Sequence, residues 1–322
     1  CLQMANYKGK RVAKDRWAVI LLAAASVVLV LVVGIIIYQK YWNKTPERPD
    51  ASQDSSAPSA GSASSGEAPD VSDEPQAPPY DFSQPAPEGE AVDNSYFDNA
   101  AFVGDSRTDG LMLYSGIGTG ENLTSNGLSV FSLAEKKALT IGEEKYTLLE
   151  ALALKEYGKV YLSLGVNELG YSSKNDSSFY RHYCEAIDAI RRVQPNAVIY
   201  VQTLIPVNEK QVEEYNGNKY NLTNDRLRTY NDLIRQAAEE KQVVCLDLYS
   251  LFVDENGSLP EGDSRDGVHL RKEPCQRWLD YLKTHTADFD ALYPDGPPVP
   301  EPVEPDEPGR PEGSAADGSV QG

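Results

Sequence analysis

Short apolar runs and longer amphipathic stretches alternate through the middle of the chain, between residues 96 and 293. The apolar runs are rich in β-branched residues, which is typical of strands buried on both faces of a sheet. These predicted strands lie at 100–103, 128–131, 159–164, 197–204 and 243–248. Helical spacing of apolar positions predicts helices at 146–157, 176–193, 224–241 and 274–289. Strands that alternate with helices indicate an α/β fold with a five-stranded parallel sheet and right-handed crossovers.

A continuous apolar run stands apart from this alternation near the start of the chain. Residues 18–37 read AVILLAAASVVLVLVVGIII, and a helix of that length spans the hydrocarbon layer of a bilayer. Trp17 and Tyr38 flank the run, and a cluster of Lys and Arg precedes it. We therefore expect a transmembrane helix over 17–38, a basic cytoplasmic segment over 1–16, and the rest of the chain outside the cell membrane. A cleaved signal peptide is the alternative, but the bulky sequence YQKYWNK follows the run where small residues should mark a cut.

Two Pro-rich acidic segments enclose the alternating region. Residues 46–95 hold eleven acidic residues and one basic residue, and residues 294–322 hold seven and one. Such segments bury too little apolar surface to fold. We expect a disordered linker at 39–95, a folded domain at 96–293 and a disordered tail at 294–322. The formal net charge of −19 lies mostly in these flanks, and it argues against a nucleic-acid partner, because phosphate binding needs a basic face.

Three short polar motifs follow strands of the predicted sheet. Gly104-Asp105-Ser106 follows the first strand, Gly165-Val166-Asn167 follows the third, and Asp266-Gly267-Val268-His269 follows the fifth after a polar loop. The carboxyl ends of parallel strands meet at one edge of the sheet, where such folds carry their sites. Taken singly, the motifs have ordinary structural explanations: a helix N-cap, an Asx turn and a surface loop. Their coincidence at one edge favours a functional site.

The residue types in these motifs suit nucleophilic catalysis. Ser106 would open a helix, whose positive end favours developing negative charge. The neutral imidazole of His269 can take the serine proton, and Asp266 can fix its tautomer. Asn167 can donate its amide to an oxyanion. The chain has three histidines and no HxxH or HxH arrangement, so we expect neither a metal nor a cofactor.

These motifs resemble the sequence blocks of the SGNH hydrolase superfamily, the GDSL-like lipases and acylhydrolases. The order Ser, Asn, Asp, His is the same, and the resemblance covers about residues 98–290. It implies a three-layer α/β/α sandwich with a five-stranded parallel flavodoxin-like sheet. It also implies that Ser106 is the nucleophile, His269 the base and Asp266 its orienting acid. The Ser106 amide and the Asn167 side chain would then line the oxyanion hole.

Two positions depart from the family pattern. Glu168 stands where the family usually has Asp, and because the preceding Asn167 is kept, we expect altered loop bonding without loss of activity. The family's second block supplies a glycine amide after the second strand. Gly127 is the glycine in that region and is assigned to the oxyanion hole, with the Val130 amide as the alternative donor.

The domain contains three cysteines. Cys245 lies in an apolar strand and is most simply a buried small hydrophobe. Cys184 and Cys275 can pair outside the cell, but their spacing does not decide it. The odd count argues against a disulfide scaffold.

Together these features predict a membrane-tethered, extracytoplasmic serine ester hydrolase. Its expected substrates are cell-envelope or other glycans carrying small acyl groups such as acetyl, because the domain lies outside a membrane and the polar stretch 207–222 follows the fourth strand. An O-acyltransferase with the same triad and a lipase are the alternatives among enzymes. A non-catalytic binding module is the alternative of another class, and the intact triad weighs against it. The oligomeric state is left open.

Overall fold

The computed structural model describes residues 79–170 and 176–300. The predicted basic segment 1–16, the predicted transmembrane helix 17–38 and most of the predicted linker lie outside the described residues. So does the predicted tail from residue 301 onward. Within the two described ranges, no helix is both long and apolar enough to cross a bilayer.

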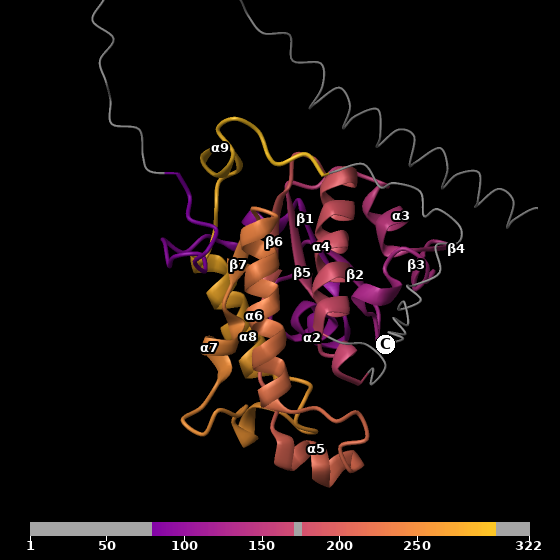
Figure 1. The fold of residues 1–322 in the computed structure, drawn as a ribbon, viewed down its shortest axis with the longest axis vertical. Coiled ribbons are helices and arrows are strands. Elements are labelled where there is room, and N and C mark those ends of the chain that lie inside the picture. Colours follow the sequence, from indigo (N-terminus) through magenta and orange to yellow (C-terminus); the bar gives the residue numbers. More distant parts are fainter. Residues whose placement is uncertain (1–78, 171–175, 301–322) are drawn as a thin grey trace, which may run out of the picture. The chain divides into compact units, whose positions relative to one another are not determined.

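Five parallel strands form the central sheet in the order β2-β1-β5-β6-β7 (Figure 1). This confirms the predicted α/β fold and its five-stranded parallel sheet. All residues of β1 and β6 are buried, as their apolar sequences predict. The strands are β1 (Ala100–Gly104), β2 (Glu121–Thr124), β5 (Lys159–Ser163), β6 (Val198–Gln202) and β7 (Val244–Leu246).

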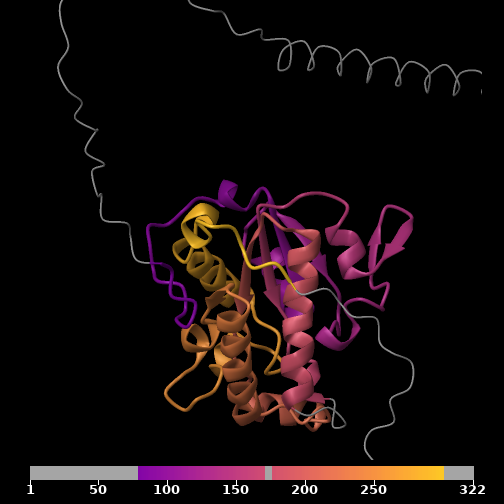
Figure 2. The ribbon, with the colours of Figure 1, turned by 45° about the horizontal axis from the view of Figure 1, so that its top comes forward.

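Helices cover both faces of the sheet (Figures 1 and 2). Helices α4 (Asp176–Val193) and α6 (Asn224–Glu240) pack on one face, close to their predicted bounds. Helices α2 (Ser106–Tyr114) and α8 (Lys272–Thr284) pack on the other face. The remaining helices in the described part are α3 (Leu148–Leu152), α5 (Glu209–Asn216), α7 (Leu248–Phe252) and α9 (Phe289–Leu292).

Successive residues of each strand serve two separate hydrophobic cores. In β1, Ala101 and Val103 belong to the core beneath α4 and α6, whereas Phe102 belongs to the core beneath α2 and α8. The second core contains a row of stacked rings across three strands. The Tyr161 ring centroid lies 4.9 Å from that of Phe102 and 4.5 Å from that of Tyr200. This double burial holds the strand ends, and the loops that follow them, in fixed positions.

The second strand is not where the apolar pattern predicts it. The run at 128–131 instead enters a 3₁₀ turn, η2 (Val130–Ser132), and β2 lies earlier in the chain. Of the four residues of β2 only Leu123 is buried, because this strand forms an edge of the sheet. Leu128 and Val130 are buried core residues beneath the loop. A polar edge strand therefore gave no apolar signal, and a buried loop gave a false one.

Two predicted helices are also shorter than expected. The helix expected at 146–157 is only α3, and an antiparallel hairpin of β3 (Leu139–Ile141) and β4 (Glu144–Tyr146) precedes it. The helix expected at 274–289 is divided into α8 and α9. α8 ends at Thr284, and at its C-cap the His285 ring stacks on Tyr281 with 3.7 Å between centroids, while His285 Nδ1 lies 2.8 Å from the Tyr281 carbonyl oxygen.

The folded unit begins earlier than the predicted boundary at 96. Residues 79–93, here called the N-terminal strap, were expected to belong to the disordered linker. Instead Pro85 forms a parallel bridge with Cys245 of β7, and the Ala86 amide donates to the Cys245 carbonyl at 2.8 Å. Proline is compatible with an edge position, because its missing N–H is not needed on the outer side. The strap therefore covers the β7 edge of the sheet, which would otherwise be unpaired.

The strap then runs to the end of α8. The Gly89 amide donates to the Thr284 carbonyl at 2.6 Å, and the Val92 amide donates to the Lys283 carbonyl at 3.0 Å. At its start, the Phe82 ring stacks on Tyr293 with 5.9 Å between centroids. These few aromatic and backbone contacts are enough to order a segment whose composition alone indicates disorder.

Candidate active site

Ser106 is the first residue of α2 and directly follows the end of β1. The turn between them needs glycine at position 104, since an added Cβ would lie 2.1 Å from Thr108 Oγ1 and 2.9 Å from the Ser163 carbonyl oxygen. Asp105 caps the helix by accepting the Arg107 amide at 2.9 Å on Oδ1. The N-cap is therefore Asp105, and the Ser106 hydroxyl remains available for other contacts.

The Ser106 hydroxyl is joined to an imidazole and a carboxylate. Ser106 Oγ lies 2.9 Å from His269 Nε2, and His269 Nδ1 lies 2.7 Å from Asp266 Oδ2. The other oxygen, Asp266 Oδ1, accepts the amides of Val268 at 2.9 Å and His269 at 2.8 Å. The structure thus brings together the three residues that the sequence assigns to a triad, although Ser106 lies far from Asp266 and His269 in the chain.

The charge of Asp266 is well defined. Partial burial alone would raise the pKa of Asp266, but the hydrogen bonds from the His269 ring and from two backbone amides outweigh it and hold the pKa well below its usual range. The carboxylate therefore stays ionised at neutral pH and can orient the imidazole. Gly267 makes this tight loop possible, because its φ is +82° and an added Cβ would lie 2.4 Å from the Asn208 carbonyl oxygen.

The predicted oxyanion donors lie in the same cleft, which has a volume of about 710 Å³. Ser106, Gly127 and Asn167 all line it, together with Asp266 and His269. The Asn167 amide donates to Asp105 Oδ2 at 3.2 Å and to the Leu128 carbonyl at 3.0 Å. Gly127 lies in a turn with φ of +70°. The sequence therefore selected residues that share one cavity, but the Asn167 amide already has two acceptors.

Glu168, the departure from the family pattern, is fully buried behind Asn167. Its Oε1 accepts the Val130 amide at 2.6 Å, so the alternative oxyanion donor is already engaged. Its Oε2 has no hydrogen-bond partner among the described residues. Burial raises the pKa of Glu168 to about 8, and the nearby Asp105 carboxyl acts in the same direction. Glu168 therefore holds a proton at neutral pH and links the loop after β5 to η2.

Arg107 is a site residue that sequence reasoning missed. Its guanidinium is buried and donates to three backbone carbonyls: Nε to Val268 at 3.0 Å, Nη1 to Ile205 at 2.6 Å and Nη2 to Pro206 at 3.3 Å. Burial lowers the pKa of Arg107 to about 10, so the group stays charged. Arg107 thereby ties the nucleophile helix to the loop that carries His269. The available signal was a cation in the first turn of a helix, where the helix dipole disfavours it.

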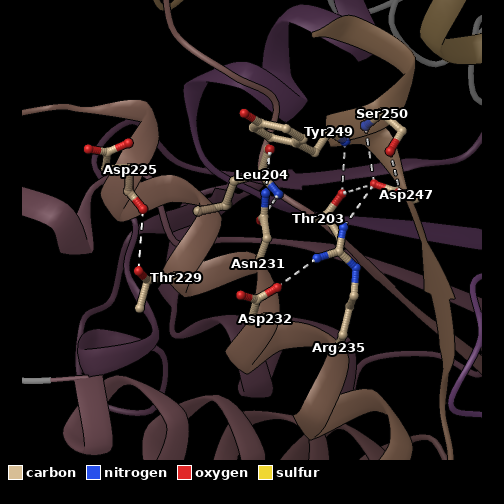
Figure 3. Close-up of polar contacts among 10 residues, drawn as sticks. All are labelled: Thr203, Leu204, Asp225, Thr229, Asn231, Asp232, Arg235, Asp247, Tyr249 and Ser250. Carbon is tan, nitrogen blue, oxygen red and sulfur yellow. Dashed lines mark hydrogen bonds and ion pairs between the residues drawn. The ribbon is translucent and has the colours of Figure 1, made fainter. Parts of the chain in front are cut away.

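A polar network at the ends of β6 and β7 holds the residues that come directly before Ile205 (Figure 3). Asn231 of α6 accepts the Leu204 amide at 2.6 Å and donates to the Leu204 carbonyl at 3.1 Å. Asp247 accepts the Thr203 hydroxyl at 3.1 Å and Arg235 Nη2 at 3.3 Å. The chain directly before Ile205 is therefore fixed on both sides.

The segment after β6 forms one wall of the cleft, as the polar stretch 207–222 predicts. Helix α5 and the loop that follows it contribute five residues to the lining: Tyr215, Asn216, Lys219, Tyr220 and Leu222. These residues line the same cavity as Ser106 and His269. The His269 side chain is about half exposed, at 51%, so a substrate can reach it.

The cysteines take no part in this site. Cys184, Cys245 and Cys275 are all buried and free, so the pairing of Cys184 with Cys275 that the sequence left open does not form. Burial raises the pKa of each thiol, to about 11 for Cys184 and about 12 for the other two. Buried neutral thiols are poor nucleophiles, so none of the three cysteines competes with Ser106 as a candidate nucleophile.

Comparison with known proteins gives a consistent family match. The sequence pattern of the GDSL-like lipase/acylhydrolase family matches residues 102–273, which include Ser106, Asn167, Asp266 and His269. No curated protein matches the chain.

Several solved structures are similar to this one. A protein from Streptococcus pneumonia, provisionally named as a platelet activating factor, is 23% identical with a TM-score of 0.47, over 60% of this chain and 83% of its own. A peptidoglycan O-acetylesterase is 17% identical with a TM-score of 0.39, over 51% of this chain and 45% of its own. An acetyl xylan esterase is 16% identical with a TM-score of 0.42, over 57% of this chain and 96% of its own.

Proposed function

The chain belongs to the GDSL-like lipase/acylhydrolase family and is a serine acylhydrolase, and from this premise we propose that it removes small acyl groups from glycans outside the cell membrane. Ser106, His269 and Asp266 form the catalytic triad in this proposal. The observation that carries it is the continuous chain of hydrogen bonds from Ser106 Oγ through the imidazole to the Asp266 carboxylate. A hydroxyl, a base and an orienting acid in that order are the requirements of acyl transfer to serine.

In the first half of the reaction, Ser106 Oγ attacks the ester carbonyl carbon while His269 Nε2 takes the hydroxyl proton. The carbonyl oxygen becomes negatively charged and accepts hydrogen bonds from the Ser106 amide at the start of α2, from the Gly127 amide and from Asn167. Asn167 can donate only by exchanging one of its present bonds, and the one to Asp105, at 3.2 Å, is the longer. The C–O bond then breaks, and His269 gives its proton to the departing alcohol.

In the second half, water attacks the acyl group on Ser106. His269 takes one proton from this water, and the tetrahedral intermediate breaks its bond to Ser106 Oγ. The serine oxygen recovers the proton from His269, and a carboxylic acid leaves. An alcohol that replaces water at this step would convert the same triad into an acyltransferase.

The lining of the cleft supports a short acyl group. A long acyl chain needs a continuous apolar channel, whereas the aliphatic residues in the described part of the lining are Val166, Leu222 and Val268. The other wall residues are amides, tyrosines and a lysine, which suit a hydroxyl-rich alcohol part. An acetylated glycan fits both halves of this lining better than a long-chain lipid.

The extracytoplasmic location rests on the sequence of residues 1–45 alone. The charge-free apolar run at 18–37 is long enough to span a bilayer, and a basic segment precedes it. This pattern supports a single membrane anchor with the domain outside. Deletion of residues 1–45 should move the protein from the membrane pellet to the soluble fraction. Persistent pelleting of the shortened chain would contradict the anchor.

The triad is tested by ester hydrolysis with the detergent-solubilised full chain. We expect release of p-nitrophenol from p-nitrophenyl acetate faster than from the octanoyl ester. Ser106→Ala should lower kcat by about four orders of magnitude or more, because no other group supplies the nucleophile. Ser83→Ala, which alters an exposed serine of the strap, is the matched control. Equal rates for wild type and Ser106→Ala would overturn the assignment.

A further inference from the structure

Three neighbouring side chains on the wall of the cleft have no role in the triad. Tyr215 is 69% exposed and Tyr220 is 53% exposed, and both line the cavity that contains Ser106. Lys219 lies between them in the sequence, and its Nζ is 4.7 Å from the Tyr220 ring centroid. Here this set of three residues is called the tyrosine wall.

The exposure of the tyrosine wall is not explained by folding. A tyrosine that stabilises the fold buries its ring, as Tyr161 and Tyr200 do in the sheet core. In the described part of the chain Tyr220 is one of a few large side chains left more than half exposed. Its ring borders Gly170, in the short 3₁₀ turn η3 (Glu168–Gly170) directly after Asn167. The ring therefore borders the turn that follows the predicted oxyanion donor and lines the same cavity as Asn167 and Ser106.

The tyrosine wall carries a positive charge, on Lys219. Among the described residues that line the cleft, Lys219 is the one lysine or arginine, and within the described ranges no ion pair joins it to a carboxylate. The acid in the same lining, Asp266, is bound to His269. Because the chain as a whole is strongly acidic, a positive group at the mouth of the cleft gives a local preference that the overall charge opposes.

We propose that Tyr215, Lys219 and Tyr220 form a subsite for the alcohol part of the ester, and that this part is an acetylated sugar bearing a carboxylate. The proposal rests on the proposed function and names its substrate class more narrowly. Sugar rings present C–H groups that pack against the faces of aromatic side chains, and an ammonium group pairs with a carboxylate on the same sugar. The acetyl group would then point towards Ser106 and the sugar ring towards the wall.

The test uses three acetyl esters and the full chain. These are p-nitrophenyl acetate, an O-acetylated cello-oligosaccharide and an O-acetylated oligogalacturonide of the same length. The measured quantity is the ratio of kcat/KM on each glycan to kcat/KM on p-nitrophenyl acetate. We expect wild type to prefer the oligogalacturonide, and Tyr220→Ala or Tyr215→Ala to lower the ratio for both glycans about tenfold, mainly through KM.

Lys219→Met should act on the acidic glycan alone. We expect its ratio for the oligogalacturonide to fall about threefold to tenfold, with a weaker dependence on salt, while the ratio for the neutral glycan stays the same. Lys219→Arg should restore the preference. The matched controls are Tyr114→Ala, an exposed tyrosine outside the cleft, and Lys210→Met, an exposed lysine of α5 paired with Glu214. Both controls should keep wild-type ratios.

The two proposals fail in different ways. If wild type hydrolyses none of the three esters, the proposed function is wrong. If wild type hydrolyses them but the tyrosine variants keep wild-type ratios, the subsite is wrong while the esterase function stands. If Lys219→Met lowers the ratio equally for the neutral and the acidic glycan, or lowers neither ratio, then Lys219 does not recognise a carboxylate on the sugar.

Discussion

The floor of the cleft and the tyrosine wall differ in how their side chains are held. At the floor, Arg107 is buried and bound to three carbonyls, and Asp266 accepts two amides and an imidazole. On the wall, Tyr215 is 69% exposed, and the segment that carries it is a short helix and loop inserted after β6. Each side chain named at the floor is held by at least three hydrogen bonds, whereas the rings of the wall are mostly exposed.

This difference predicts where activity and preference are determined. Reaction requires atoms held to within about half an ångström, which favours residues anchored to the sheet. Recognition of a sugar tolerates more movement and can use exposed rings on a loop. Substitutions at the floor should therefore change kcat or stability, and substitutions on the wall should change KM.

Arg107→Met is expected to give the larger effect in a test of this difference between floor and wall. It leaves the Ile205 and Val268 carbonyls without their donor and releases the loop that carries His269, so we expect kcat on p-nitrophenyl acetate to fall about tenfold to a hundredfold with KM nearly unchanged. Arg107→Lys should recover part of the loss, because a lysine can reach some of the same carbonyls. Kinetics and Tm are measured on the same preparations. A lowered Tm with normal kcat would make Arg107 a purely structural residue.

Glu168→Gln tests how the buried side chain of Glu168 makes the stability of the folded protein depend on pH. Glu168 has a pKa of about 8 in the folded protein, raised from 4.5, so folding favours the protonated side chain. Its stabilising contribution is complete below pH 4.5 and is lost as the pH rises through 8. The largest loss expected above pH 8 is about 5 kcal/mol, from a shift of about 3.5 pH units. Glutamine resembles the neutral acid, so Glu168→Gln should be more stable than wild type at pH 9.

Thermal unfolding between pH 5 and 9 measures this effect, with Glu239→Gln on the surface of α6 as the matched control. We expect the Tm of wild type and of the control to fall more steeply with pH than that of Glu168→Gln. Parallel curves for all three proteins would mean that Glu168 is ionised without cost. Ester hydrolysis by Glu168→Gln should remain, because the Val130 amide can still donate to the glutamine oxygen.

The sequence predicted the parts of the molecule whose information is local. β1, β5 and β6 are apolar and buried, and α4 and α6 carry regular helical patterns, so their periodicity located them. The motifs assigned to the triad were chosen because they follow strands, and the structure places Ser106, Asp266 and His269 in one cleft. Local signals were therefore enough for the buried strands, though not for the polar edge strand β2.

The parts that were missed depend on distant partners. Nothing in the sequence near Arg107 shows that its guanidinium will bind the carbonyls of Ile205 and Val268, which lie 98 and 161 positions later in the chain. The reach of Glu168 to Val130 could not be read from the sequence for the same reason. The strap was missed because its order comes from the β7 edge and from Tyr293, and not from its own composition.

The strap also determines how this domain is joined to its surroundings. Its Phe82 ring stacks on Tyr293, directly after α9, and its backbone bonds to β7 and to the end of α8. In Figure 1, α9 lies at the end of the unit opposite α5, which carries part of the cleft wall. A mechanical load on the chain ahead of the strap is therefore borne first by the sheet edge and by α8, away from the helix that borders the cleft.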